Sequence, residues 1–262
     1  MANSKPLALV TGASAGIGTA YARQLAGAGY DLLLVARRKE RLEALADELR
    51  TRHGIEAEPL PADLTKDAEL KLVEERIARA DNLEFLVNNA GFGTQGGFCE
   101  SPVEPQDAMH RLHVMATLRL THAALRKMVA RGKGAVVNVS SVAAFICRSG
   151  NTSYYATKAW INNFTEGLYL ELKSAHSPVR VQALCPGFTV TEFHDVMGFD
   201  RKLVPASLWM TAEAVVEASL RGLARGRLIV VPGWRYRFFV CLLRLMPMFL
   251  RHAVARLGPA KG

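Results

Sequence analysis

The stretch Leu7-Ala8-Leu9-Val10-Thr11-Gly12-Ala13-Ser14-Ala15-Gly16-Ile17-Gly18 decides the fold of this chain of 262 residues. Its first four residues form an apolar run of the kind that a buried parallel strand requires. A turn with three glycines follows, and a helix-like segment then runs from Thr19 to Ala28. Strand, glycine turn and helix in this order predict a phosphate cradle. The glycines let backbone N–H groups approach a pyrophosphate, and the helix N-terminus adds its positive end.

The rest of the chain alternates between strand-like and helix-like segments. Further strands are predicted at 31–36, 83–87, 135–139 and 179–184, with a short one before Asp63, and helices at 39–53, 66–80, 105–131 and 154–174. This alternation predicts a single α/β domain over residues 1–262. Its core is a Rossmann-type, doubly wound parallel sheet with helices on both faces. Ligands of such sheets bind beyond the carboxyl ends of the strands.

The end of the second strand predicts which nucleotide binds. Many NAD sites place an acidic residue there to bond the ribose 2′-OH, but this chain has Ala36 followed by Arg37 and Arg38. A guanidinium suits a 2′-phosphate, so we expect NADP(H) with Arg37 as a ligand. The alternative is that both arginines cap a solvated strand end. Asp63 is a candidate acceptor for the adenine amino group.

Tyr154 and Lys158 are four residues apart, which places them one turn apart on one face of a helix. An ammonium near a phenol favours the phenolate and lowers the phenol's pKa. A phenol tuned in this way can exchange a proton with an alcohol or a carbonyl oxygen. The pair alone leaves two alternatives open: Tyr155 as the partner of Lys158, or a solvated helix face without chemistry.

These motifs together resemble the short-chain dehydrogenase/reductase family over residues 5 to about 232. They are TGASAGIG from Thr11, NNAG from Asn88, NVSS ending at Ser141, YYATK from Tyr154 and PGFTVT from Pro186. The family spacing between its serine and its tyrosine selects Ser141 over Ser140 and Tyr154 over Tyr155.

The resemblance implies roles for individual residues. Tyr154 is the general acid in reduction, Lys158 lowers its pKa and bonds the nicotinamide ribose, and Ser141 holds the substrate oxygen. Asn88 is implied to bond the central strands together. The remaining implied cofactor contacts are Gly12, Ser14, Gly16, Ile17 and Gly18 at the pyrophosphate and ribose, Asn89, Ala90 and Gly91 at the adenine ribose, and Pro186, Gly187 and Thr191 around the nicotinamide.

One position departs from the family pattern. The fourth catalytic residue is usually an Asn, 25 residues after the first Asn of NNAG, and here that position is His113. In the family it helps to shape a helix distortion whose carbonyl holds a relay water for the lysine. We expect His113 to be catalytic, as a polar substitute in the relay or as a proton carrier that titrates near neutrality. The alternatives are a structural His beside a backbone relay, and an impaired enzyme.

Residues 189–210 are predicted to form the substrate lid. The segment is rich in apolar side chains, among them Phe193, Val196, Met197, Phe199, Leu203, Leu208 and Trp209. A lid of this kind indicates a lipophilic substrate, unless these side chains serve only to pack the lid onto the body. Phe92 and Phe98 are candidates for the same wall. His194 could touch substrate, although a surface position is the simpler interpretation.

The tail, residues 234–262, is predicted to be a basic amphipathic helix. Arg237, Arg244 and Arg251 recur every seven residues, and Pro247 should kink or split the helix. Such a helix over 234–257 could contact a membrane surface peripherally. It could equally pack on a partner subunit or across the substrate mouth.

Charge and cysteines narrow the function classes. The net charge is +9, but all 24 acidic residues precede position 218, and the 45 residues after Glu217 hold nine Lys and Arg. The basicity therefore belongs to the tail and does not indicate nucleic acid. Four scattered cysteines indicate neither a metal site nor disulfides, so we expect no metal and a cytoplasmic, or membrane-peripheral, location.

The sequence thus predicts an NADPH-dependent oxidoreductase. It would interconvert a ketone or aldehyde with an alcohol on a lipophilic or acyl-type small molecule, as a homodimer or homotetramer. The alternatives are NAD-dependent oxidation of an alcohol, a non-catalytic nucleotide-sensing protein on the same fold, and a membrane-peripheral scaffold.

Overall fold

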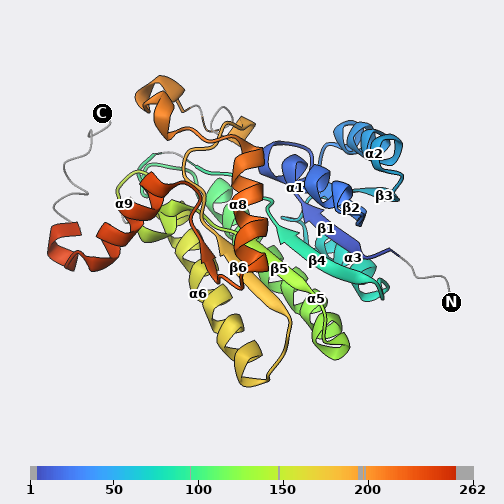
Figure 1. Ribbon diagram of the computed structural model, residues 1–262. Helices are drawn as coiled ribbons and strands as arrows, with labels where there is room; N and C mark the ends of the chain where they lie inside the picture. Colours follow the sequence, from blue (N-terminus) through green and yellow to red (C-terminus); the bar gives the residue numbers. More distant parts are fainter. Residues whose placement is uncertain (1–4, 95, 147, 194–196, 198, 252–262) are drawn as a thin grey trace.

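A parallel sheet of seven strands forms the centre of the computed structural model, which describes residues 5–94, 96–146, 148–193, 197 and 199–251 (Figure 1). The strand order is β3-β2-β1-β4-β5-β6-β7, and every pairing is parallel. The strands are β1 Leu7–Thr11, β2 Asp31–Ala36, β3 Ala57–Pro61, β4 Leu83–Asn88, β5 Ala135–Val139, β6 Arg180–Leu184 and β7 Ile229–Val230. The predicted Rossmann-type sheet is confirmed. From β1 the chain first builds β2 and β3 on one side and then returns to build β4 to β7 on the other, so the direction of winding reverses between β1 and β4.

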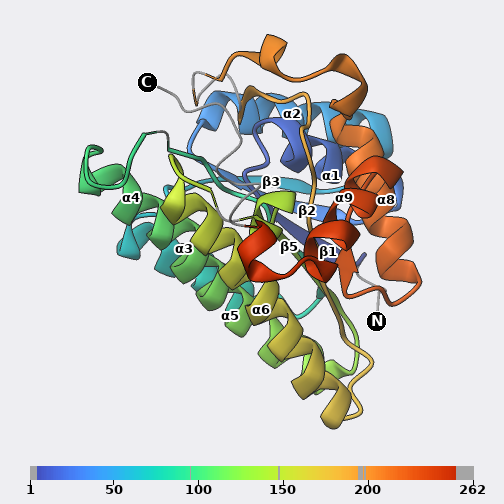
Figure 2. The ribbon, with the colours of Figure 1, turned by 90° about the vertical axis from the view of Figure 1, so that its left-hand side faces the viewer.

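Helices cover both faces of the sheet, as predicted (Figure 2). One face carries α1 (Gly16–Gly27), α2 (Lys39–His53) and α8 (Ala212–Ala224); the other carries α3 (Asp67–Ala78), α5 (Thr117–Arg131) and α6 (Thr152–Ser174). Each face has its own apolar core, because the alternating side chains of the buried strands point into both layers.

The helix predicted as continuous over 105–131 is interrupted. It consists of α4 (Val103–His110), a π-helical segment η1 (Arg111–Ala116) and α5. Interruptions of this kind frequently mark functional sites. This one contains His113 and matches the distortion that the family resemblance implies.

The lid segment, 189–210, leaves the sheet after β6 and returns to its own starting point. Thr189 and Met210 form a parallel bridge, in which the Val190 N–H donates to the Met210 carbonyl at 2.9 Å. Two short 3-10 turns, η3 (Arg201–Leu203) and η4 (Ala206–Leu208), lie between these ends. The predictions for His194 and Val196 fall outside the described residues.

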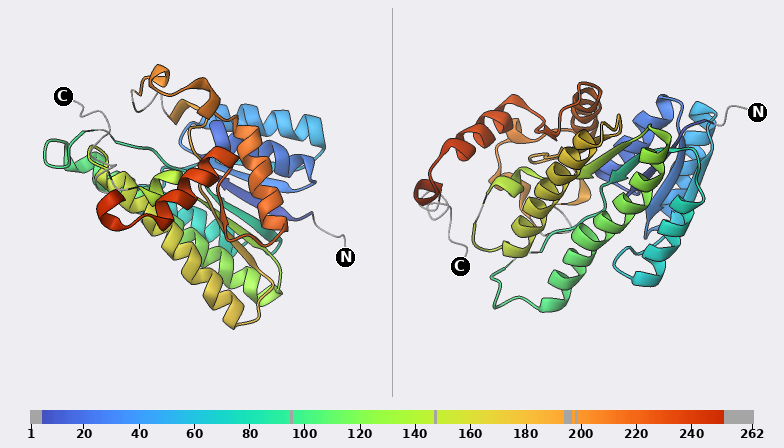
Figure 3. Two further views of the ribbon diagram at one scale, coloured as in Figure 1. Left: turned by 60° about the vertical axis from the view of Figure 1, so that its left-hand side comes forward. Right: turned by 90° about the horizontal axis from the view of Figure 1, so that it is seen from below.

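The tail forms helix α9 (Trp234–Leu245), which lies at the periphery between α6 and α8 (Figure 3). The helix stops at Met246, and a new turn begins after Pro247 over residues 248–251, so the predicted split is confirmed. The rest of the tail, 252–262, lies outside the described residues. Among the helices described, none has the length and apolar character to cross a bilayer.

A buried amide network ties the centre of the sheet to both helices behind it. Asn88 donates from Nδ2 to Thr121 Oγ1 and to Asn138 Oδ1, both at 2.8 Å, and Asn138 donates to Thr165 Oγ1 at 2.9 Å. These four side chains are buried, so their polar groups depend on one another. The implied role of Asn88 in joining the central strands agrees with this geometry.

We expect Asn88→Ala to lower the free energy of unfolding by about 1–3 kcal/mol, because it leaves the side-chain amide oxygen of Asn138, Oδ1, buried without its Asn88 donor. Urea unfolding measures the change. The matched control is Asn163→Ala on the exposed face of α6, which should stay within about 0.5 kcal/mol of the parent. Equal stability of all three proteins would contradict a structural role for the network.

Candidate active site

The carboxyl edge of the sheet gathers the predicted site residues. The glycine turn follows β1, Asn89 to Gly91 follow β4, Ser141 follows β5 and Pro186 follows β6. Tyr154 and Lys158 come from the first turns of α6, which packs against the turn after β5. Parallel strands all end at this edge, so residues far apart in sequence meet there.

The glycine turn is built for close backbone approach. Gly12 and Gly16 have φ of +65° and +54°, a region that side chains with a Cβ rarely adopt. A Cβ on Gly18 would stand 2.1 Å from the Gly12 carbonyl oxygen, and one on Gly16 would meet the Thr191 methyl at 2.7 Å. No side chain caps α1, whose N-cap residue is Ala15. The first N–H groups of the helix are therefore available to an anion.

The segment after β4 is fixed to this turn. Asn89 donates from Nδ2 to the Thr11 carbonyl at 2.9 Å, and the Thr11 hydroxyl accepts from the N–H groups of Asn89 and Ala90. Gly91 packs directly on the His113 ring, where a Cβ would stand 2.7 Å from Nε2. These contacts join the segments that follow β1 and β4, between which the strand order reverses. Ile17, which is expected to line the cofactor site, packs against the apolar core beneath α1.

The end of β2 is basic, but the arginine that turns toward the glycine turn is not the one that the sequence predicted. Arg38, rather than Arg37, donates to Ser14 Oγ at 3.1 Å. Glu192 from the lid forms ion pairs with Arg38 (2.7 Å) and Arg41 (2.6 Å). Sequence reasoning missed this carboxylate because it comes from more than 150 residues further along the chain.

Asp63 lies next to the same corner. Partial burial disfavours its carboxylate, but hydrogen bonds from the Thr65 hydroxyl and N–H and the charge of Arg37 outweigh this, so the pKa of Asp63 is lowered. Its Oδ1 accepts from the Thr65 hydroxyl at 2.8 Å. Arg37 therefore lies within electrostatic reach of Asp63, and both remain candidates for the adenosine end of a dinucleotide.

The turns after β5 and β6 face each other. The Ser141 hydroxyl donates to the Pro186 carbonyl at 3.4 Å, and Ser140 donates to the Lys158 carbonyl. Tyr236 of α9 packs its ring over Gly187, and its hydroxyl donates to the Leu208 carbonyl at 2.7 Å. The tail thus holds the turn after β6 in place, a role that the amphipathic pattern did not reveal.

Tyr154 and Lys158 lie close together, but their pKa values differ from the prediction. Burial raises the pKa of Tyr154 to about 12, while a hydrogen bond with Ser141 acts in the opposite direction. Burial also lowers the pKa of Lys158 to about 8. The Lys158 ammonium donates to the Val139 carbonyl at 3.0 Å and lies 5.6 Å from the Tyr154 ring centroid, not at its hydroxyl. The expected lowering of the Tyr154 pKa is therefore wrong for this structure: desolvation dominates.

His113 is 1% exposed and fully hydrogen-bonded. Its Nε2 accepts from the Phe92 N–H at 3.2 Å, which assigns the proton to Nδ1, and Nδ1 lies 2.9 Å from Thr157 Oγ1. Thr157 in turn donates to the Tyr154 carbonyl at 2.9 Å. Burial, followed by the charges of Lys158 and His110, lowers the pKa of His113 well below 6.5. His113 therefore does not fit a proton carrier that titrates near neutrality, and a catalytic role for it remains a prediction.

Two apolar side chains of the lid lie near Tyr154 and the segment after β4. The Phe193 ring from the lid lies 5.9 Å from the Tyr154 ring, and Met197 packs against Gly93. Phe199 instead stacks on Phe188, and Trp209 packs on the same ring at an angle of 47°, so these two side chains pack the lid onto the body. Of the other described candidates for the wall, Phe98 and Leu203 are exposed, whereas Phe92 and Leu208 are half-buried.

These residues fit a nicotinamide dinucleotide. The cradle without Cβ atoms and the uncapped α1 N-terminus suit a pyrophosphate, Arg37, Arg38 and Ser14 suit the adenosine end, and Lys158 and Thr191 lie toward the reactive end. Within the described part of the chain, no cluster of three His, Cys, Asp or Glu side chains could hold a metal ion.

Comparisons with known proteins agree with this geometry. A family model described as short chain dehydrogenase matches residues 6–200. An oxidoreductase of Myxococcus xanthus is 33% identical over 250 residues, which cover 95% of this chain and 96% of that protein. Among solved structures, a short-chain dehydrogenase from Sphingobium yanoikuyae in complex with NADPH is 36% identical, with a TM-score of 0.85 over 98% of this chain and 97% of that one. A bulky-bulky ketone specific alcohol dehydrogenase from Comamonas testosteroni is 33% identical, with a TM-score of 0.79 over 97% and 99% of the two chains.

We expect kcat of the parent protein to show no ionisation between about pH 6 and 7, because the His113 pKa lies well below this range. His113→Leu should lower kcat by about tenfold and reduce stability by about 1–3 kcal/mol, since it removes the partners of Thr157 and of the Phe92 N–H. His113→Asn, which can keep one of these bonds, should lose less.

The pH profiles of kcat for the three proteins, with urea unfolding in parallel, make this test. An ionisation near pH 6.5 in the parent that disappears in His113→Asn would restore the proton-carrier role. A parent-like rate and stability in His113→Leu would show that the network does not matter.

Proposed function

This chain belongs to the short-chain dehydrogenase/reductase family, and we propose that it reduces a lipophilic ketone or aldehyde with NADPH and catalyses the reverse oxidation of the alcohol. The family makes it an oxidoreductase with a nicotinamide cofactor that acts on small molecules. The observation that carries the proposal is the meeting of Tyr154, Ser141 and Lys158 beside the glycine cradle.

The proton step in reduction falls to Tyr154. With a pKa of about 12 it is protonated at neutral pH, as a general acid must be. Ser141 lies at the same hydroxyl and would donate to the substrate oxygen, which fixes the carbonyl against the phenol. The bound nicotinamide supplies or accepts the hydride. In the reverse direction the proton acceptor would be the Tyr154 phenolate, which takes the proton from the alcohol.

Lys158 supports the phenolate that remains after proton transfer. Its positive charge is buried and lies beside the Tyr154 ring, where low dielectric strengthens the attraction to a developing anion. Its pKa of about 8 lies above neutrality, so most of it carries this charge at pH 7. The pair therefore suits a reductase at neutral pH.

Preference for NADPH is supported by the basic corner at the end of β2. Arg38 is already oriented toward Ser14, and Arg37 lies nearby with no ion pair in the described structure. The relative from Sphingobium yanoikuyae was solved with NADPH. One observation favours the alternative, NAD-dependent oxidation: Glu192 places a carboxylate on Arg38, where it would repel a 2′-phosphate.

A lipophilic substrate is supported by the surroundings of Tyr154. Phe193 lies against the Tyr154 ring, and Phe92 lies against His113 beside it. The relative from Comamonas testosteroni is described as specific for bulky-bulky ketones. Ketones of graded chain length, assayed by NADPH absorbance, would identify the class.

We expect Tyr154→Phe to lower kcat by at least about 1000-fold, because the proton donor is lost. Binding of NADPH, measured by calorimetry, should stay within a few-fold of the parent. Tyr155→Phe is the matched control, since it removes a neighbouring phenol whose ring lies 6.3 Å away. Equal losses in the two variants would show that the catalytic tyrosine is misassigned.

We expect Arg38→Ala to lower the ratio of kcat/KM for NADPH to that for NADH by about 10- to 100-fold, the range of a lost charge-assisted hydrogen bond. Glu192→Gln should raise the same ratio several-fold, because it removes the competing carboxylate. Arg52→Gln, elsewhere on α2 and exposed, is the control with the same loss of charge as Arg38→Ala.

Opposite results would decide for the alternative function. If the parent prefers NADH and Glu192→Gln abolishes that preference, Glu192 serves the ribose hydroxyl and the chain is an NAD enzyme. If neither cofactor supports turnover of any ketone while both bind, the nucleotide-sensing alternative holds.

A further inference from the structure

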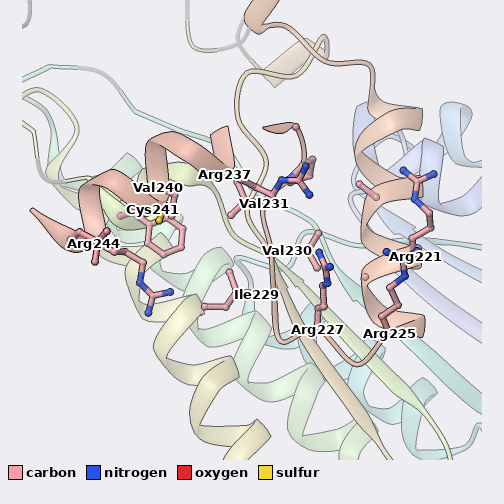
Figure 4. A pocket seen from close by; sticks show the side chains of 16 residues that line it. Arg221, Arg225, Arg227, Ile229, Val230, Val231, Arg237, Val240, Cys241 and Arg244 are labelled. Carbon is pink, nitrogen blue, oxygen red and sulfur yellow. The ribbon is translucent and has the colours of Figure 1, made fainter. Parts of the chain in front are cut away.

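A second concave site lies between α8, β7 and α9 (Figure 4). Its volume is about 570 Å³, larger than the other cavity described, beside Gly16. Apolar side chains line its floor, including Ile229, Val230 and Val240. We call this site the arginine groove, because five arginines line it: Arg221, Arg225, Arg227, Arg237 and Arg244.

The arginines stand on both walls of the groove. Arg237 and Arg244 come from α9, whereas Arg221, Arg225 and Arg227 come from α8 and the segment after it (Figure 4). All five are exposed. Of these five arginines, only Arg221 forms an ion pair with another described residue, Glu217 on its own helix. The sequence has no acidic side chain after Glu217 that could neutralise the others.

The outer face of α9 next to the groove is apolar and uncovered. Trp234, Phe238 and Leu245 are 66%, 68% and 78% exposed. At 3.6 residues per turn these three share one face, and Arg237 and Arg244 lie about a quarter turn away from it. The helix is anchored to the body by its third face, through Tyr236, Val240 and Leu243. The face formed by Trp234, Phe238 and Leu245 is thus exposed although the opposite side of the helix is packed on the body.

From this arrangement we propose that the arginine groove and the outer face of α9 form a docking site for an anionic lipid surface, with the arginines binding the phosphates of lipid headgroups. A bilayer surface offers anionic phosphates for the arginines and, directly below them, an apolar layer for the exposed face of α9. Aromatic and aliphatic side chains enter the acyl boundary, and arginines remain at the phosphate level. Guanidinium groups also bind phosphate oxygens in a bidentate manner.

A second copy of the chain fits this face poorly. A two-fold axis through the groove would place the same patch against itself, and so arginine against arginine. The uncompensated positive charge calls for a negative occupant instead. All five arginines come from the 45 residues after Glu217, which hold nine Lys and Arg and no acidic residue.

Docking here would bring lipid close to the catalytic edge. Phe145 lines the groove and closes the short turn η2 (Val142–Phe145), for which Ser141 is the N-cap. Helix α9 packs against the same turn. A lipophilic substrate dissolved in the bilayer would therefore reach the enzyme on the side where Ser141 lies.

The test is co-sedimentation of the full chain with phosphatidylcholine vesicles, with and without phosphatidylglycerol. We expect strong binding only with phosphatidylglycerol, weakened by high salt. Arg237→Gln/Arg244→Gln should lower the affinity about thirtyfold, because each arginine near an anionic surface contributes about a fivefold factor. The control Arg52→Gln/Arg126→Gln, which removes the same charge from exposed positions on α2 and α5, should change it less than about twofold.

The apolar face has its own readouts. Phe238→Ser should weaken vesicle binding, whereas Leu72→Ser, at a position 58% exposed on α3, should not. Trp234 emission should shift to shorter wavelength on binding, and Trp234→Phe should remove that shift.

Three results would overturn the proposal: no preference for phosphatidylglycerol, equal weakening by the two double arginine variants, or equal effects of the two serine variants. A fourth result would be that the parent protein does not bind vesicles but melts at a higher temperature in inorganic phosphate. The double variant Arg237→Gln/Arg244→Gln would then lack this rise in melting temperature. That result would assign the groove to a small phosphate ligand. None of these readouts depends on turnover, so a failed enzymatic proposal would leave this test intact.

Discussion

The structure depends on one steric constraint, the approach of backbone to backbone at the glycine turn. Gly18 lies so close to the Gly12 carbonyl that a Cβ would stand 2.1 Å from that oxygen. This proximity lets Asn89 reach the Thr11 carbonyl and join the end of β4 to the end of β1. The crevice at the sheet's switch point therefore exists because α1 can begin immediately above its own strand.

The catalytic edge is a region where burial outweighs charge. A phenol and an ammonium taken out of water both move toward their neutral forms, which is why the pKa of Tyr154 rises while that of Lys158 falls. His113 follows the same rule and uses both ring nitrogens to join Phe92 to Thr157. A site of this kind favours proton donation by Tyr154 over a resting phenolate.

The lid and the tail, which follow β6, contact parts of the molecule that lie far apart in the sequence. Glu192 of the lid pairs with Arg38 at the end of β2, and Phe193 of the lid lies against Tyr154. The Tyr236 hydroxyl bonds to Phe188 and Leu208, so α9, which forms one wall of the arginine groove, also holds the turn after β6. One stretch of chain after β6 thus contacts the end of β2, Tyr154 and the arginine groove.

The sequence by itself determined the sheet, the glycine cradle and the placement of Tyr154 above Lys158, because these depend on local periodicity and on fixed spacings along one helix or one turn. The distortion at His113 also followed from the family pattern. Only the tertiary structure decided the rest. Glu192 on Arg38, the buried partners of His113, the raised pKa of Tyr154 and the meeting of Arg227 with Arg237 across a groove all arise from contacts between distant segments or from burial. Desolvation and long-range pairing leave no periodic trace in a sequence, since they depend on which elements the fold brings together.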